Sequence, residues 1–233
     1  MNDFVMPLPL PLDVVSLTMG LITIGSVSGD EGGLADSVEQ ALSTLPHLNV
    51  TRTGDTVVAR TATGHRERLV IAGHLGTSAP LDNEQAFVEM GRLFGVGGCD
   101  VKGGLAALLK TAIALGARSA GPDVTLVLHP GDTLADVPPA LLQGDLALLL
   151  APTDLTVQAS PEAASHPAVQ RLAALSEAPL VTAPTPPAPE GLPTVTFGPG
   201  DPTVARTAGE FVPTAQLTQA EWVLREWLRP GPR

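Results

Sequence analysis

Three short apolar runs constrain the fold more than any other feature of this sequence. They read RERLVIAGH, DVTLVLH and LALLLA, and a stretch with helical spacing from about Val101 to Arg118 separates the first run from the second. Continuous rather than alternating hydrophobicity is typical of strands that are buried on both faces of a parallel sheet. Strand, helix and strand in this order predict a parallel α/β unit.

Other segments extend this unit into one predicted domain over residues 1–233. The segment 160–191 is rich in proline, and we expect it to be mainly a linker. Ser28 or Asp30 is the expected N-cap of the second helix. The expected fold class is α/β, with a mixed, largely parallel sheet and helices on both faces. Further helices are predicted at 13–24, 34–45, 168–175 and 214–228, a hairpin at 47–61, and a last strand at 193–197.

The composition excludes several classes of protein. The 233 residues include 24 acidic and 13 basic side chains, giving a net charge of −11, which is the wrong sign for binding a phosphate backbone. No stretch of about 18 apolar residues is free of Pro or Gly, so no membrane span is expected. The start of the sequence lacks the basic residues of a secretory signal, and the single cysteine, Cys99, fits a reducing compartment. We expect a globular cytoplasmic protein without nucleic-acid or membrane partners.

Polar side chains follow the predicted strands. In parallel sheets, functional groups lie beyond the carboxyl ends of the strands. We therefore expect five candidates to converge on one edge of the sheet, namely His74, Asp100, Asp132, Asp154 and Asp201.

Four segments at these strand ends resemble the motifs of a known family. They are GHLGTSAP, GVGGCDVKGGLAALLKTA, DVTLVLHPGD and LLLAPTD, and in this order and spacing they are similar to the dinuclear-zinc aminoacylase and desuccinylase family of metallopeptidases. Within it, the motifs most resemble those of succinyl-diaminopimelate desuccinylases. SVSGDE and FGPGDPTVARTAGEFVP also match, so the resemblance covers residues of about 10–158 and 190–228. It implies a zinc-exopeptidase-like catalytic domain, hydrolysis of a linear amide, and a role in amino-acid metabolism.

The resemblance also implies metal-ligand positions, and this chain keeps only part of them. His74 stands at the first ligand, and Asp100 stands at the carboxylate that bridges two metals. The aspartate that orients the first histidine in the family is Gly76 here. The resemblance therefore implies a vestigial metal site at His74 and Asp100.

The remaining positions carry residues that do not suit zinc. The family's two adjacent glutamates are Asp132 and Thr133 here, its next acidic ligand is Ala151, and its final histidine is Arg206. Thr133 and Ala151 supply no charge, and Arg206 places a permanent cation where a dication should bind. No cofactor is therefore expected. Asp132 remains as a candidate catalytic residue, and Arg206 becomes a candidate anion-binding residue.

The resemblance also implies a lid and dimerisation domain of roughly 100 residues, which this sequence does not show at the expected place. The family inserts this domain after the third-strand region, whereas Gln158 here runs almost directly into the Pro-rich connection near 160–191. The substrate contacts that the resemblance assigns to this insert are therefore not expected.

Local structure offers other interpretations of the same residues. Asp100 is also a suitable N-cap for a helix that starts at Val101, and Asp132 is a suitable turn residue. Cys99 lies at a Gly-rich helix start, a setting that can lower a thiol pKa, although no histidine is near it in sequence. A new single-metal site could be built from His74, His129, Asp132 and Asp136.

Three functions follow from these observations. The leading hypothesis is a pseudoenzyme, an inactive relative with a binding or assembly role and an amino acid-like small molecule or a protein as its partner. The second is an active metal-dependent N-acyl amino acid amidohydrolase with a remodelled site, which would use zinc with His74, Asp100, His129 or Asp132. The third is a structural partner that oligomerises through surface left bare by the missing lid. The sequence leaves the oligomeric state open.

Overall fold

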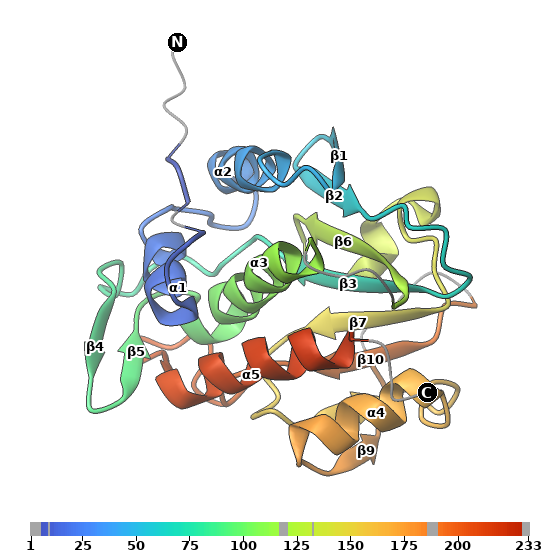
Figure 1. Cartoon of the computed structure of the whole chain (residues 1–233). Coiled ribbons are helices and arrows are strands. Elements are labelled where there is room, and N and C mark those ends of the chain that lie inside the picture. Colours follow the sequence, from blue (N-terminus) through green and yellow to red (C-terminus); the bar gives the residue numbers. More distant parts are fainter. Residues whose placement is uncertain (1–5, 9, 117–120, 132, 186–190, 230–233) are drawn as a thin grey trace.

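The apolar runs of the sequence form the adjacent central strands of an eight-stranded sheet (Figure 1). The computed structural model describes residues 6–8, 10–116, 121–131, 133–185 and 191–229. The order across the sheet is β1 (Asn49–Thr53), β2 (Thr56–Arg60), β6 (Asp123–His129), β3 (Arg68–His74), β7 (Leu146–Leu150), β10 (Thr194–Phe197), β8 (Val157–Ala159) and β9 (Leu180–Thr182). The strands β6, β3, β7 and β10 are parallel neighbours, and the hairpin β1–β2 and strand β8 join them antiparallel.

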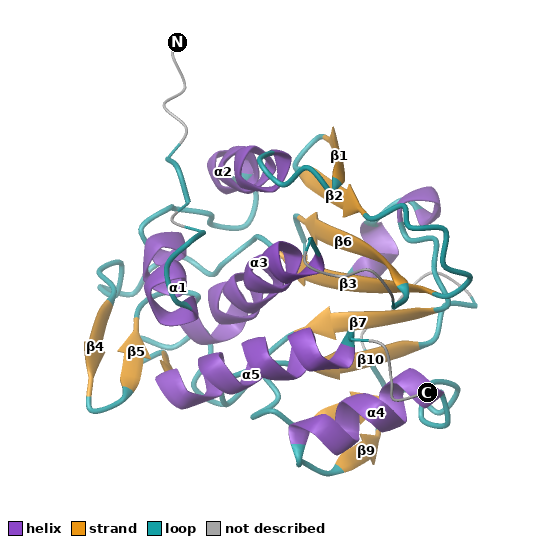
Figure 2. Ribbon diagram, in the orientation of Figure 1, coloured by secondary structure: helices purple, strands orange, loops and turns teal. Residues whose placement is uncertain are grey.

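The two faces of the sheet are covered differently, because adjacent residues of a strand point to opposite sides. Leu69 and Ile71 of β3 pack into the core that includes the α-helices, whereas Val70 and Ala72 face a second, smaller core. Figure 2 shows the long helices gathered over one face of the sheet. They are α1 (Val14–Ile22), α2 (Gly32–Ser43), α3 (Gly103–Leu115), α4 (Pro167–Ser176) and α5 (Thr214–Trp227).

The second core is closed by short 3-10 turns rather than by α-helices in the described part of the chain. Leu134 of η2 (Leu134–Asp136) is fully buried there, and Leu141 of η3 (Pro139–Leu141) packs against the same cluster. The predicted α/β fold class, with helices packed on a mixed and largely parallel sheet, is confirmed. None of the described helices is long and apolar enough to cross a membrane.

The predicted helices and the hairpin are present, but the predicted cap of the second helix is wrong. At α1 the Asp13 carboxylate accepts hydrogen bonds from two backbone N–H groups of the first turn, both at 3.0 Å. Helix α2 begins at Gly32 after Glu31, and neither Ser28 nor Asp30 caps it. The backbone N–H of Ser28 donates to the carbonyl of Thr77 at 3.0 Å, so this residue is held by the loop after β3 instead.

The segment 160–191 is more ordered than expected. Helix α4 and strand β9 lie within it, and β9 extends the sheet by pairing parallel with β8. The indole N–H of Trp227 in α5 donates to the carbonyl of Ala168 at 2.7 Å, which fixes α4 against α5. Residues 186–190 lie outside the described part.

A small second sheet was not predicted. It consists of β11 (Phe211–Pro213), β5 (Arg92–Phe94) and β4 (Phe87–Glu89), and it lies at the end of the molecule beside α1 in Figure 1. The rings of Phe87 and Phe94 stack with centroids 4.9 Å apart. Strand β11 brings the segment that follows β10 to the start of α3, where the candidate site lies.

Candidate functional site

A pocket of about 160 Å³ lies where β3, β6 and β7 end. This is the edge of a parallel sheet at which functional groups are expected. Four of its lining residues carry polar side chains, and the others are small or apolar. The lining consists of His74, Asp100, His129 and Arg206 with Ala72, Gly73, Leu149, Leu150 and Ala151.

The two histidines are neighbours in this wall. His74 and His129 are the last residues of β3 and β6, and they are register partners in the parallel pair. Nδ1 of His129 lies 3.0 Å from the carbonyl oxygen of Pro130. A carbonyl oxygen only accepts hydrogen bonds, so Nδ1 carries the proton in this contact. The second histidine was predicted only as part of a new site.

The central contact of the pocket is an ion pair between Asp100 and Arg206. Nε of Arg206 lies 2.7 Å from Oδ2 of Asp100, and the two side chains are 48% and 9% exposed. The interpretation of Asp100 as the N-cap of a helix starting at Val101 is wrong. A π-helical turn, η1 (Gly98–Lys102), precedes α3, and the Asp100 carboxylate meets the guanidinium instead of capping the helix.

Glu210 holds this ion pair in place from the other side. Its buried carboxylate accepts hydrogen bonds from the backbone N–H groups of Gly97, Cys99 and Asp100 at 2.8–3.1 Å, and from that of Arg206 at 3.2 Å. Burial raises the pKa of Glu210, while the N–H donors oppose the rise. Sequence reasoning missed Glu210, because it lies about 110 residues away from the turn that it binds.

Cys99 is a packed thiol, and the interpretation that its setting lowers its pKa is wrong. Burial raises the pKa of Cys99, and the nearby carboxylates of Glu210 and Asp100 raise it further. Its Sγ donates to the carbonyl of Asp201 at 3.3 Å. A neutral buried thiol is a poor nucleophile, so Cys99 contributes packing rather than chemistry at this edge.

Convergence of the five predicted strand-end candidates is only partial. His74 and Asp100 line the pocket, whereas Asp132 lies outside the described residues. Asp154 binds the side-chain amide of Gln216, and Asp201 accepts hydrogen bonds from the N–H and hydroxyl of Thr203. Neither lines the pocket, and nor does the exposed Asp136.

The position of the missing orienting aspartate is filled by another residue. A Cβ atom at Gly76 would lie 2.8 Å from Oε1 of Glu31 and 3.0 Å from Oγ of Ser28. Glu31 is 4% exposed, and its other carboxylate oxygen accepts the N–H of Gly29 at 3.0 Å. Glu31 and Ser28 therefore occupy the space that a side chain at position 76 would need, and such a side chain would require Glu31 to move.

The described residues of the pocket do not form a recognisable metal centre. No group of three His, Cys, Asp or Glu side chains that could hold a metal ion occurs among them. Ala151 offers no donor atom, and the guanidinium of Arg206 meets the carboxylate that would bridge two metals.

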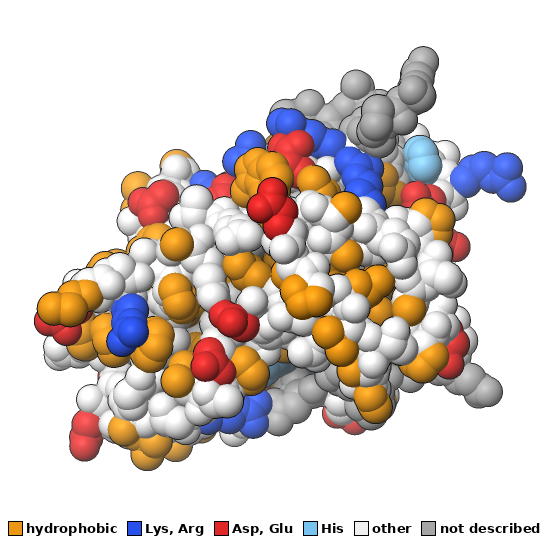
Figure 3. Space-filling view, turned by 90° about the horizontal axis from the view of Figure 1, so that it is seen from below, with side chains coloured by type: hydrophobic (Ala, Val, Ile, Leu, Met, Phe, Trp, Pro, Cys, Tyr) orange, Lys and Arg blue, Asp and Glu red, His pale blue; other side chains and the backbone are white. Residues whose placement is uncertain are grey.

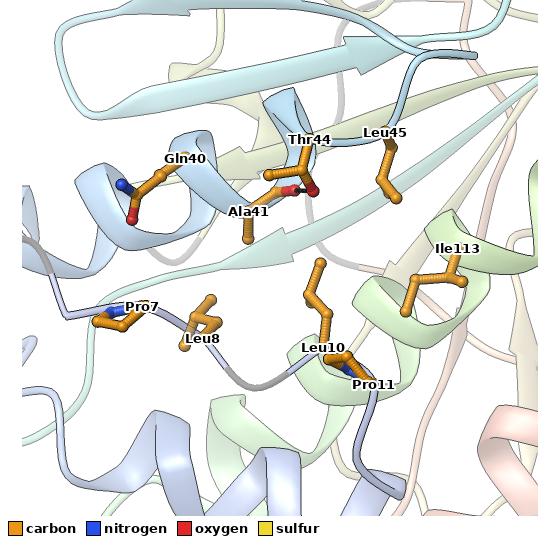
Figure 4. A pocket seen from close by; sticks show the side chains of 9 residues that line it. All are labelled: Pro7, Leu8, Leu10, Pro11, Gln40, Ala41, Thr44, Leu45 and Ile113. Atoms are coloured by element: carbon orange, nitrogen blue, oxygen red, sulfur yellow. Dashed lines mark hydrogen bonds between the residues drawn. The ribbon is translucent and has the colours of Figure 1, made fainter.

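A second pocket, of about 540 Å³, lies between the N-terminal segment, α2 and α3 (Figure 4). Its walls are almost entirely apolar, and the hydroxyl of Thr44 is satisfied by the carbonyl of Ala41 at 2.7 Å. None of the described residues that line it carries a titratable side chain.

The parallel sheet with a polar pocket at its strand ends defines a zinc-exopeptidase-like catalytic domain. The aminopeptidase PepT from Bacillus cereus shares this fold with a TM-score of 0.75 and 10% identity, over 92% of this chain and 97% of that one. An M20 family metallo-carboxypeptidase from Sulfolobus solfataricus matches with a TM-score of 0.52 and 16% identity, over 65% of this chain and 39% of that one. At these identities the likeness concerns the fold alone. No protein-family model matches the chain.

Sequence similarity identifies the relatives more narrowly. Succinyl-diaminopimelate desuccinylase of Corynebacterium glutamicum is 36% identical over 173 residues, which cover 68% of this chain and 47% of the relative. The chain is therefore a relative of the succinyl-diaminopimelate desuccinylases, as its motifs predict. It spans about half the length of the curated relatives that it matches.

Proposed function

We propose that this chain is a catalytically inactive relative of the zinc-dependent desuccinylases, with a retained role in binding. The ion pair between Asp100 and Arg206 is the observation that carries this proposal. A bridging carboxylate uses both oxygens to hold two metal ions roughly 4 Å apart. Here one of those oxygens lies 2.7 Å from the guanidinium of Arg206.

Electrostatic repulsion by Arg206 opposes the binding of a metal ion at Asp100. An arginine side chain keeps its charge at any physiological pH, so a dication entering the pocket would meet a fixed positive charge beside its main ligand. Thr133 and Ala151 stand where the resemblance implies carboxylates, so neither of these positions adds a negative charge that would offset the repulsion. Zinc is therefore not part of the proposed function.

The connection between β8 and α4 supports the loss of catalysis. Strand β8 ends at Ala159 and α4 begins at Pro167, so only residues 160–166 lie between them. Seven residues cannot hold a lid of ordinary domain size.

We place the protein in the cytoplasm, where its single buried thiol would stay reduced.

A reversion experiment tests this proposal. The wild-type chain and a variant with Thr133→Glu, Ala151→Asp and Arg206→His are each incubated with zinc and assayed for hydrolysis of N-succinyl-diaminopimelate and N-acetyl amino acids. The wild type is expected to show no hydrolysis above the rate without protein. Zinc-dependent hydrolysis by the wild type that is lost in His74→Ala and Asp100→Ala would overturn the proposal.

A single-metal amidohydrolase is the second candidate, and the pairing of His74 with His129 favours it. Two histidines at the ends of adjacent strands are suitable zinc ligands, and the third ligand would have to come from outside the described residues, where Asp132 lies. The same assay separates the two functions, because a remodelled enzyme would lose activity in His129→Ala whereas an inactive relative has none to lose.

A structural, oligomerising role receives less support from the surface. Residues 160–166, all within the described part, expose no large hydrophobic side chain. Exposed apolar side chains are found on β4 and the turn after it, with Phe87, Val88 and Met90 at 51%, 47% and 95% exposure, and also on β9 and α5, with Val181 and Trp222 at 42% and 51%. Figure 3 shows hydrophobic side chains at the end of the molecule where β4 and β5 lie. The bare surface expected from a missing lid is therefore not at the chain's β8–α4 connection.

A further inference from the structure

We propose that a third pocket, beside the β4–β5 hairpin, binds a small organic cation that carries an alkylated ammonium group. Its volume of about 560 Å³ is within the range of roughly 300–1,000 Å³ that is common for small-molecule sites. Two phenyl rings, of Phe87 and Phe94, line this hairpin pocket together with the acids Asp82, Glu84 and Glu210. It shares none of the described lining residues of the strand-end pocket, so the inference does not depend on the proposed lack of catalysis.

Three phenyl rings form a row across the small sheet, and a cation already lies at one end of this row. Phe87, Phe94 and Phe211 are at paired positions on β4, β5 and β11, so their side chains are on the same face of the sheet. The ring of Phe94 stacks on that of Phe87 at 4.9 Å, and its centroid lies 5.6 Å from that of Phe211. At the far end, the guanidinium of Arg92 lies 4.5 Å from the centroid of Phe211. Because ring faces carry partial negative charge, the row already stabilises one cation.

The other end of the row is open to a ligand. Phe87 is 51% exposed, although Phe94 covers one of its faces. No lysine or arginine is among the described residues that line the hairpin pocket at this end. A second cation can therefore contact the ring of Phe87 without displacing Arg92 from Phe211.

Two exposed carboxylates supply the opposite charge. Asp82 and Glu84 line the pocket, and within the described part of the chain neither carboxylate forms a hydrogen bond or an ion pair. The buried carboxylate of Glu210 is already used by the backbone N–H groups of Cys99 and Asp100. An exposed carboxylate alone binds cations weakly. Beside phenyl rings it favours a cation whose methyl groups contact the rings, which describes an alkylated ammonium group.

Hydrogen bonds hold the wall of the pocket in place before a ligand binds. The side-chain amide of Asn83 accepts the N–H of Leu81 at 2.9 Å and donates to the carbonyl of Thr207 at 3.2 Å. The carbonyl of Asn83 accepts the N–H of Val96 at 2.8 Å. These bonds join the loop before β4 to the end of β5 and to the segment before β11. A wall that is already fixed loses little freedom on binding, which strengthens the complex.

The acidic rim distinguishes a free organic cation from a phosphocholine headgroup. The phosphate of such a headgroup is close to its ammonium group, so it would lie near Asp82 and Glu84 and be repelled by them. A free cation meets no such repulsion. We therefore assign the pocket to a small ammonium compound in solution rather than to a lipid.

The test measures binding of choline to the full chain by calorimetry and by NMR titration, with sodium chloride keeping the ionic strength constant. Dimethylbutanol, the uncharged carbon isostere of choline, and phosphocholine are the comparison ligands. The wild type should bind choline saturably, with a Kd of about 1 mM, and both comparison ligands several-fold more weakly. Sodium is present throughout, so general attraction of cations by the net charge of −11 does not produce saturation by choline.

Two substitutions with matched controls identify the groups that bind. Phe87→Leu keeps an apolar side chain without the ring, and it should weaken choline binding about two- to fivefold while leaving dimethylbutanol unchanged. Trp222→Leu is its control, because Trp222 is also 51% exposed but lies on α5, outside the pocket. Glu84→Gln should weaken choline about twofold, whereas Glu89→Gln removes an exposed acid of β4 that does not line the pocket and should have less effect.

Equal affinity of the wild type for choline and dimethylbutanol would overturn the inference, and so would equal choline affinity in the wild type and Phe87→Leu. No saturation of the folded wild type at about 100 mM choline, a hundred times the expected Kd, would overturn it as well. None of these results bears on zinc or hydrolysis, so the proposed function is tested separately. Circular dichroism of each variant confirms that the compared chains are folded.

Discussion

Two arginines of this molecule pair with carboxylates in opposite arrangements. Arg52, on β1, binds Asp36 and also Glu39 and Asp55 at 3.2 and 3.0 Å, and its side chain is 21% exposed while those acids are 36–39% exposed. Arg206 is 48% exposed, and its partner Asp100 is 9% exposed. In the cluster around Arg52 the guanidinium is largely buried and the carboxylates are exposed, whereas in the pocket the carboxylate of Asp100 is buried and the guanidinium of Arg206 is exposed.

This difference determines what each arginine does for the protein. The carboxylates around Arg52 would be hydrated without it, so the cluster contributes little to stability. Asp100 depends on Arg206, because a buried carboxylate without a cation loses its hydration and gains nothing in return. The pocket arginine therefore has a structural role at the position where the resemblance implies a metal ligand.

The largest effect is expected from Arg206→Ala. This substitution leaves the buried Asp100 carboxylate without its cation, and we expect the free energy of unfolding to fall by about 3 kcal/mol, the lower end for a broken buried pair, since Arg206 itself is half exposed. Urea unfolding measures the change. Asp100→Ala in the Arg206→Ala background should recover a large part of the loss, and strict additivity of the two changes would show that the residues do not interact.

Lys102 provides a buried cation with a different partner. It is fully buried and donates to the carbonyl of Ile24 at 2.8 Å, and burial lowers its pKa to about 8 although Glu210 opposes the change. A lysine whose pKa is depressed on folding is neutral in the folded chain but charged in the unfolded chain between about pH 8 and 10.5. Its contribution to stability is therefore present at high pH and is lost as the pH falls through 8.

Comparison of the wild type with Lys102→Met isolates this effect. Between pH 8 and pH 9.5 the unfolding free energy of the wild type should rise by about 1.6 kcal/mol relative to the variant, somewhat less than the limit of about 1.36 kcal/mol per pH unit because the folded lysine is still half protonated at pH 8. Other titrating groups are common to both chains and cancel in the difference. A constant difference over this range would mean that Lys102 keeps its proton in the folded chain.

The smallest effect is expected from Arg52→Ala. The carboxylates that it leaves behind are solvated, so the unfolding free energy should fall by less than about 1 kcal/mol, and the loss should shrink further in 0.5 M salt. Urea unfolding at two salt concentrations measures both changes. A loss as large as that of Arg206→Ala would remove the contrast between the two arginines.

How far the sequence predicts this molecule depends on the range of the interactions. The runs around Ile71 and Leu148 encode buried strands locally, so the sheet and its pocket edge were predictable. The cap of α2 and the pairing of β11 with β5 were not, because they depend on contacts with distant segments, such as Ser28 with Thr77 and Phe211 with Phe94. The β4–β5 hairpin is local, and its strands of three residues each are too short to give a periodic signal.

The candidate site follows the same rule. His74 and Asp100 were predictable from their places after a strand and before a helix. The ion pair of Asp100 with Arg206 joins residues 106 positions apart, and the resemblance could indicate that both lie near the site but not that they bind each other. The role of Glu210 gave no local signal at all, since only the folded chain brings it to the turn at Gly97.

Zinc stoichiometry tests the central claim most directly. The purified wild-type chain and Arg206→His are dialysed against a small excess of zinc, and the metal retained per chain is measured by mass spectrometry. Because Arg206 keeps a cation beside Asp100, the wild type should retain no stoichiometric zinc, and Arg206→His should retain more than the wild type. One or two zinc ions retained per wild-type chain would contradict the account.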